Sequence, residues 1–211
     1  MIDLTNEDNM ELMKRYPDNY FELAIVDPPY GIETKGNAQD RFRMGKDLSL
    51  INDAKPTKKY FNELFRVSKN QIIWGYNHLS NLLPSCREFI FWNKQNPVVT
   101  FSDGELAWTS FMGTAKCFDY SFNKAIQDNK NQKIHPTQKT YKLYEWLLMN
   151  YANEGDKILD THLGSGSIAL ACHNLDFDLV GCELDTEYYD AACKRLKRHQ
   201  AQLTIFNTPS E

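Results

Sequence analysis

The chain has 211 residues, a usual size for one domain, and 42% of them are hydrophobic, which allows a sizeable core. Its net charge of −4 excludes a protein that is basic throughout, so any affinity for nucleic acid must come from local patches. The sequence has no run of 18 apolar residues and no apolar leader, so neither a membrane span nor a secretory signal is expected. Scattered cysteines without a C-x-x-C pair predict reduced thiols in a cytoplasmic protein.

Short apolar runs alternate with amphipathic stretches along the chain. The apolar runs predict strands at 23–27, 71–75, 88–93, 105–111, 157–160 and 178–183. The amphipathic stretches predict helices at 56–68, 137–151, 166–174 and 186–200. Because strands separated by helices form parallel β–α–β units, we expect an α/β sandwich that binds its ligands beyond the carboxyl ends of the strands.

Two stretches show no clear hydrophobic period. Residues 31–50 predict a long loop, and loops of that length tend to be functional or mobile. Residues 112–134 are polar and rich in Asn and Lys, and they predict a second irregular segment. Basic residues gather in the first of these stretches, at 55–59 and at 194–198, so local positive patches are expected despite the acidic total.

The first predicted strand ends in the sequence Asp27-Pro28-Pro29-Tyr30. Proline has no N–H donor and a fixed φ, so the two prolines stop the strand and leave a carbonyl without a ladder partner. The Asp27 carboxylate and the Pro28 carbonyl are then two acceptors at the ligand-binding edge, and Tyr30 adds a flat face for stacking. An exocyclic amine on an aromatic ring needs both features. An ordinary proline turn is the alternative reading.

A glycine turn follows a later strand. Asp160 ends that strand, and Gly164 and Gly166 allow a tight turn with close backbone approach to a ligand. Such turns bind nucleotide-like groups, although two glycines alone are a weak signal. Ala169 replaces the third glycine of the dinucleotide fingerprint and no Walker A sequence is present, which favours a sulfonium and an amino acid over a pyrophosphate. Glu183, which ends the next strand, can accept both ribose hydroxyls; a solvated loop acid is the alternative.

A fourth stretch, H-P-T-Q-K at 135–139, precedes a predicted helix. Thr137 is a suitable cap for that helix. Because no other histidine lies at metal-ligand spacing from His135, no metal site is expected.

Three motifs occur in a characteristic order: D-P-P-Y at 27–30, H-P-T-Q-K at 135–139 and D-T-H-L-G-S-G-S at 160–167. Together they resemble the DNA amino-methyltransferases that use S-adenosylmethionine, in the permuted β class where the catalytic motif precedes the cofactor motif. The resemblance covers nearly the whole chain. It departs from the family pattern at His162, where an aromatic residue is usual, and at Thr140, where proline is frequent.

The resemblance implies a Rossmann-like α/β fold with a seven-stranded sheet flanked by helices on both faces. The single methyltransferase domain would span 1–211, with a short target-recognition insert around 112–134 and a mobile loop around 31–50. The implied reaction is methyl transfer from S-adenosylmethionine to the N6 amine of an adenine that has left the duplex. Tyr30 would stack on the flipped base.

The resemblance also implies the site residues. The catalytic residues are expected to be Asp27, Pro28, Pro29 and Tyr30. The residues expected to bind S-adenosylmethionine are Asp8, Asp27, Pro28, His135, Thr137, Lys139, Asp160, Thr161, His162, Leu163, Gly164, Ser165, Gly166 and Glu183. For Asp8, a first-turn helix acid is an equal alternative. Apart from the resemblance, the charge of the loop beside Tyr30 predicts that Lys35, Arg41, Arg43 and Lys46 meet DNA phosphate, and an ordinary solvated loop is the alternative.

DNA is the expected partner, and a homodimer and a cognate restriction nuclease are further candidates. An RNA methyltransferase or a protein-amide methyltransferase would keep the same cofactor site, and the acid at position 27 argues against the amide version. An RNA methyltransferase and a cytosine-N4 methyltransferase stay open at this point. A catalytically silent subunit that only binds nucleic acid is an alternative from another class, and the intact motifs argue against it.

Overall fold

The computed structural model describes residues 1–31, 54–96, 102–128, 134–135 and 137–206. Strands and helices alternate along these residues. The strands are β1 (Ile2–Asn6), β2 (Phe21–Val26), β3 (Ser68–Trp74), β4 (Phe89–Asn93), β5 (Gly104–Thr109), β6 (Lys116–Asp119), β7 (Lys157–Asp160) and β8 (Asp178–Glu183). The helices are α1 (Asn9–Lys14), α3 (Lys58–Val67), α4 (Tyr76–Leu79), α5 (Phe122–Asp128), α6 (Tyr141–Tyr151), α7 (Ser167–Leu175) and α8 (Thr186–Phe206).

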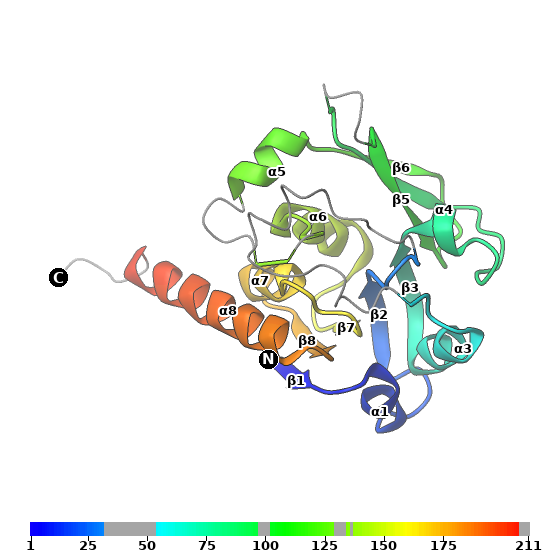
Figure 1. Ribbon diagram of the computed structural model, residues 1–211, viewed down its shortest axis with the longest axis horizontal. Helices are drawn as coiled ribbons and strands as arrows, with labels where there is room; N and C mark the ends of the chain where they lie inside the picture. Colours follow the sequence, from blue (N-terminus) through cyan, green and yellow to red (C-terminus); the bar gives the residue numbers. More distant parts are fainter. Residues whose placement is uncertain (32–53, 97–101, 129–133, 136, 207–211) are drawn as a thin grey trace.

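The strands form one mixed sheet in the order β1-β8-β7-β2-β3-β5-β4-β6 (Figure 1). The pairs from β1 to β3 are parallel, whereas β5 runs antiparallel to β3 and to β4. The predicted α/β fold class is confirmed, but the sheet has eight strands in the described residues rather than the expected seven. The two strands without a separate sequence prediction, β1 and β6, are the outer strands, where a continuous apolar run is not needed.

Helices cover both faces of the sheet, and each face has its own apolar core. On one face, α6 and α7 pack through residues such as Leu147 and Leu170 against sheet residues such as Ile158. On the other face, α1 and α3 pack through residues such as Met13 and Phe61. Each strand in the middle of the sheet is therefore buried on both sides, which explains the short unbroken apolar runs in the sequence.

Two local predictions need correction. Helix α6 begins at Tyr141 and is capped by Thr140, whose side chain accepts a hydrogen bond from the backbone N–H of Lys142 at 3.3 Å, so Thr137 is not the cap. The segment 112–134 is not irregular, because it contains β6 and α5. The predicted loop at 31–50 lies, apart from Gly31, outside the described residues.

The topology brings the carboxyl ends of three central strands to one edge. Strands β2 and β7 pair in parallel with Ala24 opposite Leu159, so Asp27 and Asp160 follow or end neighbouring strands at the same edge. Strand β8 lies on the other side of β7 with Gly181 opposite Asp160, and it ends at Glu183. The D-P-P-Y turn and the glycine turn are therefore neighbours in space although they are far apart in the sequence.

Candidate active site

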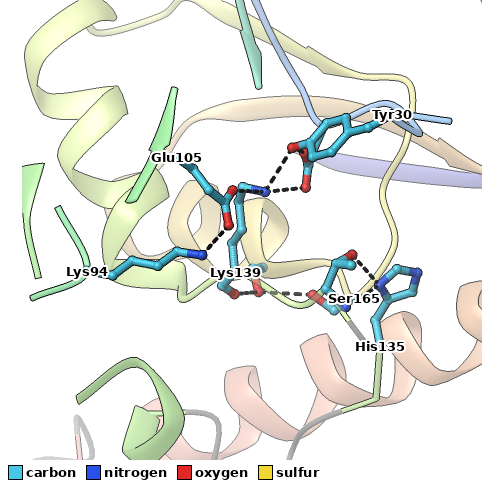
Figure 2. A network of polar contacts seen from close by, with 9 residues as sticks. Tyr30, Lys94, Glu105, His135, Lys139 and Ser165 are labelled. Carbon is cyan, nitrogen blue, oxygen red and sulfur yellow. Dashed lines mark hydrogen bonds and ion pairs between the residues drawn. The ribbon is translucent and has the colours of Figure 1, made fainter. Parts of the chain in front are cut away.

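The turn after β2 presents the Asp27 carboxylate with both oxygens engaged. The Tyr30 hydroxyl donates a hydrogen bond to Oδ1, and the ammonium of Lys139 lies 2.6 Å from Oδ2 (Figure 2). Burial and the nearby carboxylates raise the pKa of Tyr30 well above its usual value, so its hydroxyl stays protonated and acts as a donor. The sequence predicted the position of Asp27, but not this pair of partners.

Lys139 is the buried centre of a charged cluster whose other members are partly buried. Only 5% of the residue is exposed, and its ammonium contacts Asp27 on one side and Oε2 of Glu105 at 2.8 Å on the other (Figure 2). Burial disfavours the ammonium, but Asp27 and Glu105 outweigh it and raise the pKa of Lys139 above its usual range. Lys139 was expected among the cofactor-binding residues, and its side chain here pairs with Asp27, the acid expected to be catalytic.

Glu105 is a site residue that the sequence did not reveal. It lies on β5, and its Oε1 pairs with the ammonium of Lys94, which follows β4. Burial alone would raise the pKa of Glu105, but Lys139 and Lys94 lower it to about 2, so the carboxylate is ionised at neutral pH. A single acid near the start of a strand carries no motif, and only the strand pairing brings it to the site.

The Tyr30 ring, the expected platform for a base, stacks on the imidazole of His78. The two ring centroids are 5.2 Å apart with planes 14° from parallel. His78 lies in the short helix α4, and its carbonyl accepts a hydrogen bond from Lys55 at 2.9 Å. Stacking of Tyr30 on a base stays a prediction, and His78 is the aromatic ring that now supports one face of Tyr30.

The glycine turn after β7 has the backbone that the sequence predicts. Gly164 and Gly166 have φ angles of +51° and +69°, a left-handed region where glycine is favoured. The backbone N–H of Gly164 donates to Oε2 of Glu183 at 2.8 Å, and the N–H of Asp185 donates to Oε1 at 3.0 Å. Burial raises the pKa of Glu183. Glu183 thus joins the glycine turn to the end of β8, and its ribose-binding role stays a prediction.

Asp160 lies beneath this turn and is almost fully buried, with 2% exposed. Its Oδ1 accepts a hydrogen bond from the backbone N–H of His162 at 2.9 Å. Burial, together with the charges of Asp27 and Glu183, raises the pKa of Asp160 to about 8. A buried acid of this kind favours a positively charged ligand, which would supply the missing counter-charge.

His162 replaces the aromatic residue that the family pattern predicts, and it forms polar contacts that a phenyl ring could not. Its ring packs edge-on against Tyr60, and its Nε2 lies 3.2 Å from the amide nitrogen of Asn9. Thr161 contacts both Tyr60 and His162 through its hydroxyl, at 2.6 and 3.0 Å. Burial lowers the pKa of His162 to about 4, so the ring is neutral at physiological pH.

A buried arginine supports the glycine turn from behind. Arg195 of α8 donates from Nη1 to the carbonyl of Ser165 at 2.9 Å and to the hydroxyl of Ser167 at 2.8 Å. The same Ser167 hydroxyl donates to the carbonyl of Lys139 at 2.7 Å. The sequence placed Arg195 in a basic surface patch, but only 4% of it is exposed, so it belongs to the interior.

The remaining predicted residues lie in different surroundings. Asp8 is the N-cap of α1 and accepts a hydrogen bond from the N–H of Met10 at 2.8 Å, and its contact with the cofactor stays a prediction. The His135 ring packs edge-on against Tyr188, and its Nδ1 is 3.1 Å from the Thr137 hydroxyl. The four residues expected to meet DNA phosphate lie outside the described residues: Lys35, Arg41, Arg43 and Lys46.

The part of the chain that the structure describes contains neither a cluster of metal ligands nor a membrane-spanning helix. There, no group of three or more His, Cys, Asp or Glu residues could hold a metal ion. In the same residues, no helix combines the length and the apolar character needed to cross a bilayer.

Comparisons with known proteins show which proteins this chain and its fold resemble. Over nearly its whole length the chain resembles a type II methyltransferase, M.HpaI of Haemophilus parainfluenzae, with 24% identity over 224 residues that cover 89% of this chain and 71% of that protein. The M1.HpyAVI–SAM complex superposes with a TM-score of 0.64 and 22% identity, covering 93% of this chain and all of the other.

A third comparison gives a solved structure with the same fold, and a family model gives the family. The cytosine-N4-specific PvuII DNA methyltransferase superposes with a TM-score of 0.59 and 13% identity, covering 96% of this chain and 92% of that one. The family model N6_N4_Mtase, described as DNA methylase, matches residues 69–194, which is more than half of the chain. The chain therefore belongs to the N6_N4_Mtase family of DNA methylases.

Proposed function

We propose that this protein transfers the methyl group of S-adenosylmethionine to the N6 amine of adenine in DNA. The observation that carries the proposal is the arrangement at the strand ends: the Asp27 carboxylate follows β2, and the glycine turn follows the neighbouring β7. Family membership supports the reaction class, and the acid at position 27 favours adenine over cytosine through the resemblance of D-P-P-Y to the adenine-type motif.

The residues around the glycine turn fit a cationic cofactor. S-adenosylmethionine supplies an electrophilic methyl on a sulfonium and also carries an ammonium. Asp160 and Glu183 are acids whose pKa values are raised by burial, so positive charge beside them would be stabilised. The backbone of the turn from Asp160 to Gly166 would hold the methionine part, and Glu183 would hold the ribose.

Asp27 and the Pro28 carbonyl would orient the target amine. By accepting its two hydrogens they draw the nitrogen lone pair out of conjugation with the ring and aim it at the methyl carbon. The nitrogen–carbon bond forms as the sulfur–carbon bond breaks, and the sulfur keeps the electron pair as a neutral thioether. Positive charge develops on the amine, where the Asp27 carboxylate stabilises it before the nitrogen loses one proton to the surroundings.

The test is methyl transfer from radiolabelled S-adenosylmethionine to duplex DNA, single-stranded DNA and tRNA in parallel. We expect label on DNA, loss of label with Asp27→Ala, and N6-methyladenine as the only modified base after hydrolysis to nucleosides. N4-methylcytosine as the product would contradict the choice of base. Label on tRNA alone would contradict DNA as substrate, and cofactor binding without any transfer would favour the silent subunit.

Assembly with other chains belongs to the same proposal. A second copy of the protein and a cognate restriction nuclease are candidate partners, and the likeness to a type II methyltransferase supports the second. Size measurement in solution tests the first candidate. Sequencing of methylated positions in DNA from cells that express the chain would reveal a recognition site against which a nuclease can be sought.

A further inference from the structure

We propose that Lys139 is a positioning residue for methyl transfer: its ammonium holds the Asp27 carboxylate in place, and Glu105 keeps that ammonium bound when the target amine takes its position on Asp27. The inference rests on the proposed function, because it needs Asp27 to be the acceptor of the amine. It assigns roles to Lys139 and Glu105, whose side chains contact Asp27 or each other rather than the glycine turn.

The geometry places Lys139 between two acids from different parts of the sheet. Asp27 follows β2, Glu105 lies on β5, and the ammonium is 2.6 Å from the first and 2.8 Å from the second (Figure 2). Lys94 pairs with the other oxygen of Glu105, so two ammonium groups face two carboxylates and the cluster is electrically balanced. Such a balance is required where charges are buried, because an unpaired one is unstable.

The contacts of Asp27 explain why a second acid is needed. One carboxylate oxygen accepts from Tyr30 and the other faces Lys139, so an incoming amine must share or replace one of these contacts. If Lys139 yields its place on Asp27, the ammonium would lose a buried partner. Glu105 prevents that loss, because it already contacts the same ammonium and is ionised at neutral pH.

The backbone of Lys139 has a separate task. Its carbonyl accepts the hydrogen bond from Ser167, the first residue of α7 beyond the glycine turn. A change of the Lys139 side chain leaves this carbonyl in place. We therefore expect that the Lys139 side chain can be replaced with little effect on the glycine turn. A variant that binds the cofactor normally but transfers methyl slowly would support the positioning role, whereas weaker cofactor binding would indicate a structural role.

The test compares Lys139→Met and Glu105→Gln with wild type, using S-adenosylmethionine affinity and the single-turnover rate of methyl transfer to duplex DNA. For Lys139→Met we expect affinity within about twofold and a rate lower by about 100-fold, the scale of a misplaced reacting group. For Glu105→Gln we expect the single-turnover rate to reach half its maximum at a higher DNA concentration, because Lys139 stays on Asp27 and competes with the amine. An unchanged DNA dependence would overturn the role given to Glu105. Lys142→Met removes another lysine ion pair, with Glu145 at 2.9 Å, and should leave both quantities unchanged.

A double variant covers the case in which Lys139→Met fails to fold because it leaves two carboxylates facing one ammonium. Lys139→Met with Glu105→Gln removes one charge of each sign and should fold, bind S-adenosylmethionine and remain slow. A rate near that of wild type in either Lys139 variant would overturn the inference, as would loss of rate that only parallels loss of cofactor affinity. Absence of transfer by wild type itself would instead refute the proposed function.

Discussion

Gly75 leaves the space that the Tyr30 ring fills. A Cβ atom placed on Gly75 would lie 2.1 Å from Cε1 of Tyr30 and 2.7 Å from its Cζ, which is far inside contact distance. Gly75 follows β3 and precedes α4, and its φ of +79° is itself left-handed. The backbone turn and the position of Tyr30 therefore both depend on the absence of a side chain at Gly75.

Gly75→Ala should displace the Tyr30 ring and slow methyl transfer. The left-handed backbone alone costs about 1 kcal/mol with a side chain present, and the clash adds to it. Gly155→Ala is a matched control, because Gly155 has a φ of +84° and nothing within 4 Å of an added Cβ. Chemical denaturation of both variants measures the loss of stability, and single-turnover rates measure the effect of displacing the Tyr30 ring. Equal rates in the two variants would contradict the dependence of Tyr30 on Gly75.

The buried Asp160 makes stability depend on pH in a definite direction. Its pKa is about 8 in the folded chain against a usual value of 3.8, so the folded state keeps a proton that the unfolded state has lost. The contribution of Asp160 to the free energy of unfolding, measured without cofactor, should therefore fall as pH rises from about 4 to about 8. Asp160→Asn keeps the shape but cannot ionise, so its stability should exceed that of wild type increasingly over this window. Denaturant titrations at several pH values measure the difference, and parallel curves would contradict the prediction.

Arg195 should contribute to cofactor affinity without touching the cofactor. Its guanidinium fixes Ser165 and Ser167 on either side of Gly166, and burial lowers its pKa to about 10, so it stays charged at neutral pH. Hydrogen bonds from a charged group are worth about 1.5–3 kcal/mol, so Arg195→Met should weaken S-adenosylmethionine binding by roughly 10- to 100-fold. Arg198→Met, at an exposed position of the same helix, is the control. Calorimetry measures the affinity for S-adenosylmethionine. Unchanged affinity in Arg195→Met would show that the glycine turn keeps its conformation without the hydrogen bonds from Arg195.

Much of this fold could be predicted because strong local signals agreed with the topology. The apolar run before Asp27 and the glycine turn after Asp160 are local patterns, and each stands at the end of a predicted strand. The outer strands β1 and β6 could not be predicted this way, because each has a sheet neighbour on one side only and needs no apolar run.

In the site, too, some residues could be predicted from a local sequence pattern and others could not. Asp27 and Tyr30 carry a motif, whereas the side-chain partners of Lys139 depend on which strands lie side by side. Glu105 reaches the site because β5 pairs with β3, a relationship between distant segments that no local pattern records. Arg195 appeared to belong to a surface patch because its sequence neighbours are charged, and only the packing of α8 against the glycine turn reveals its burial.

Four basic residues that follow Tyr30 in the sequence are expected to bind DNA and not the cofactor. Replacing Lys35, Arg41, Arg43 and Lys46 by alanine should weaken DNA binding and leave S-adenosylmethionine affinity intact. Each lost phosphate contact should reduce the slope of log K against log salt by about 0.9 on duplex DNA. The control replaces three exposed cations of α8: Lys194, Lys197 and Arg198. An equal loss of affinity per removed charge in both variants would contradict the prediction, because the segment would then act only through net charge. A larger loss per charge in the first variant would support DNA binding beside the D-P-P-Y turn.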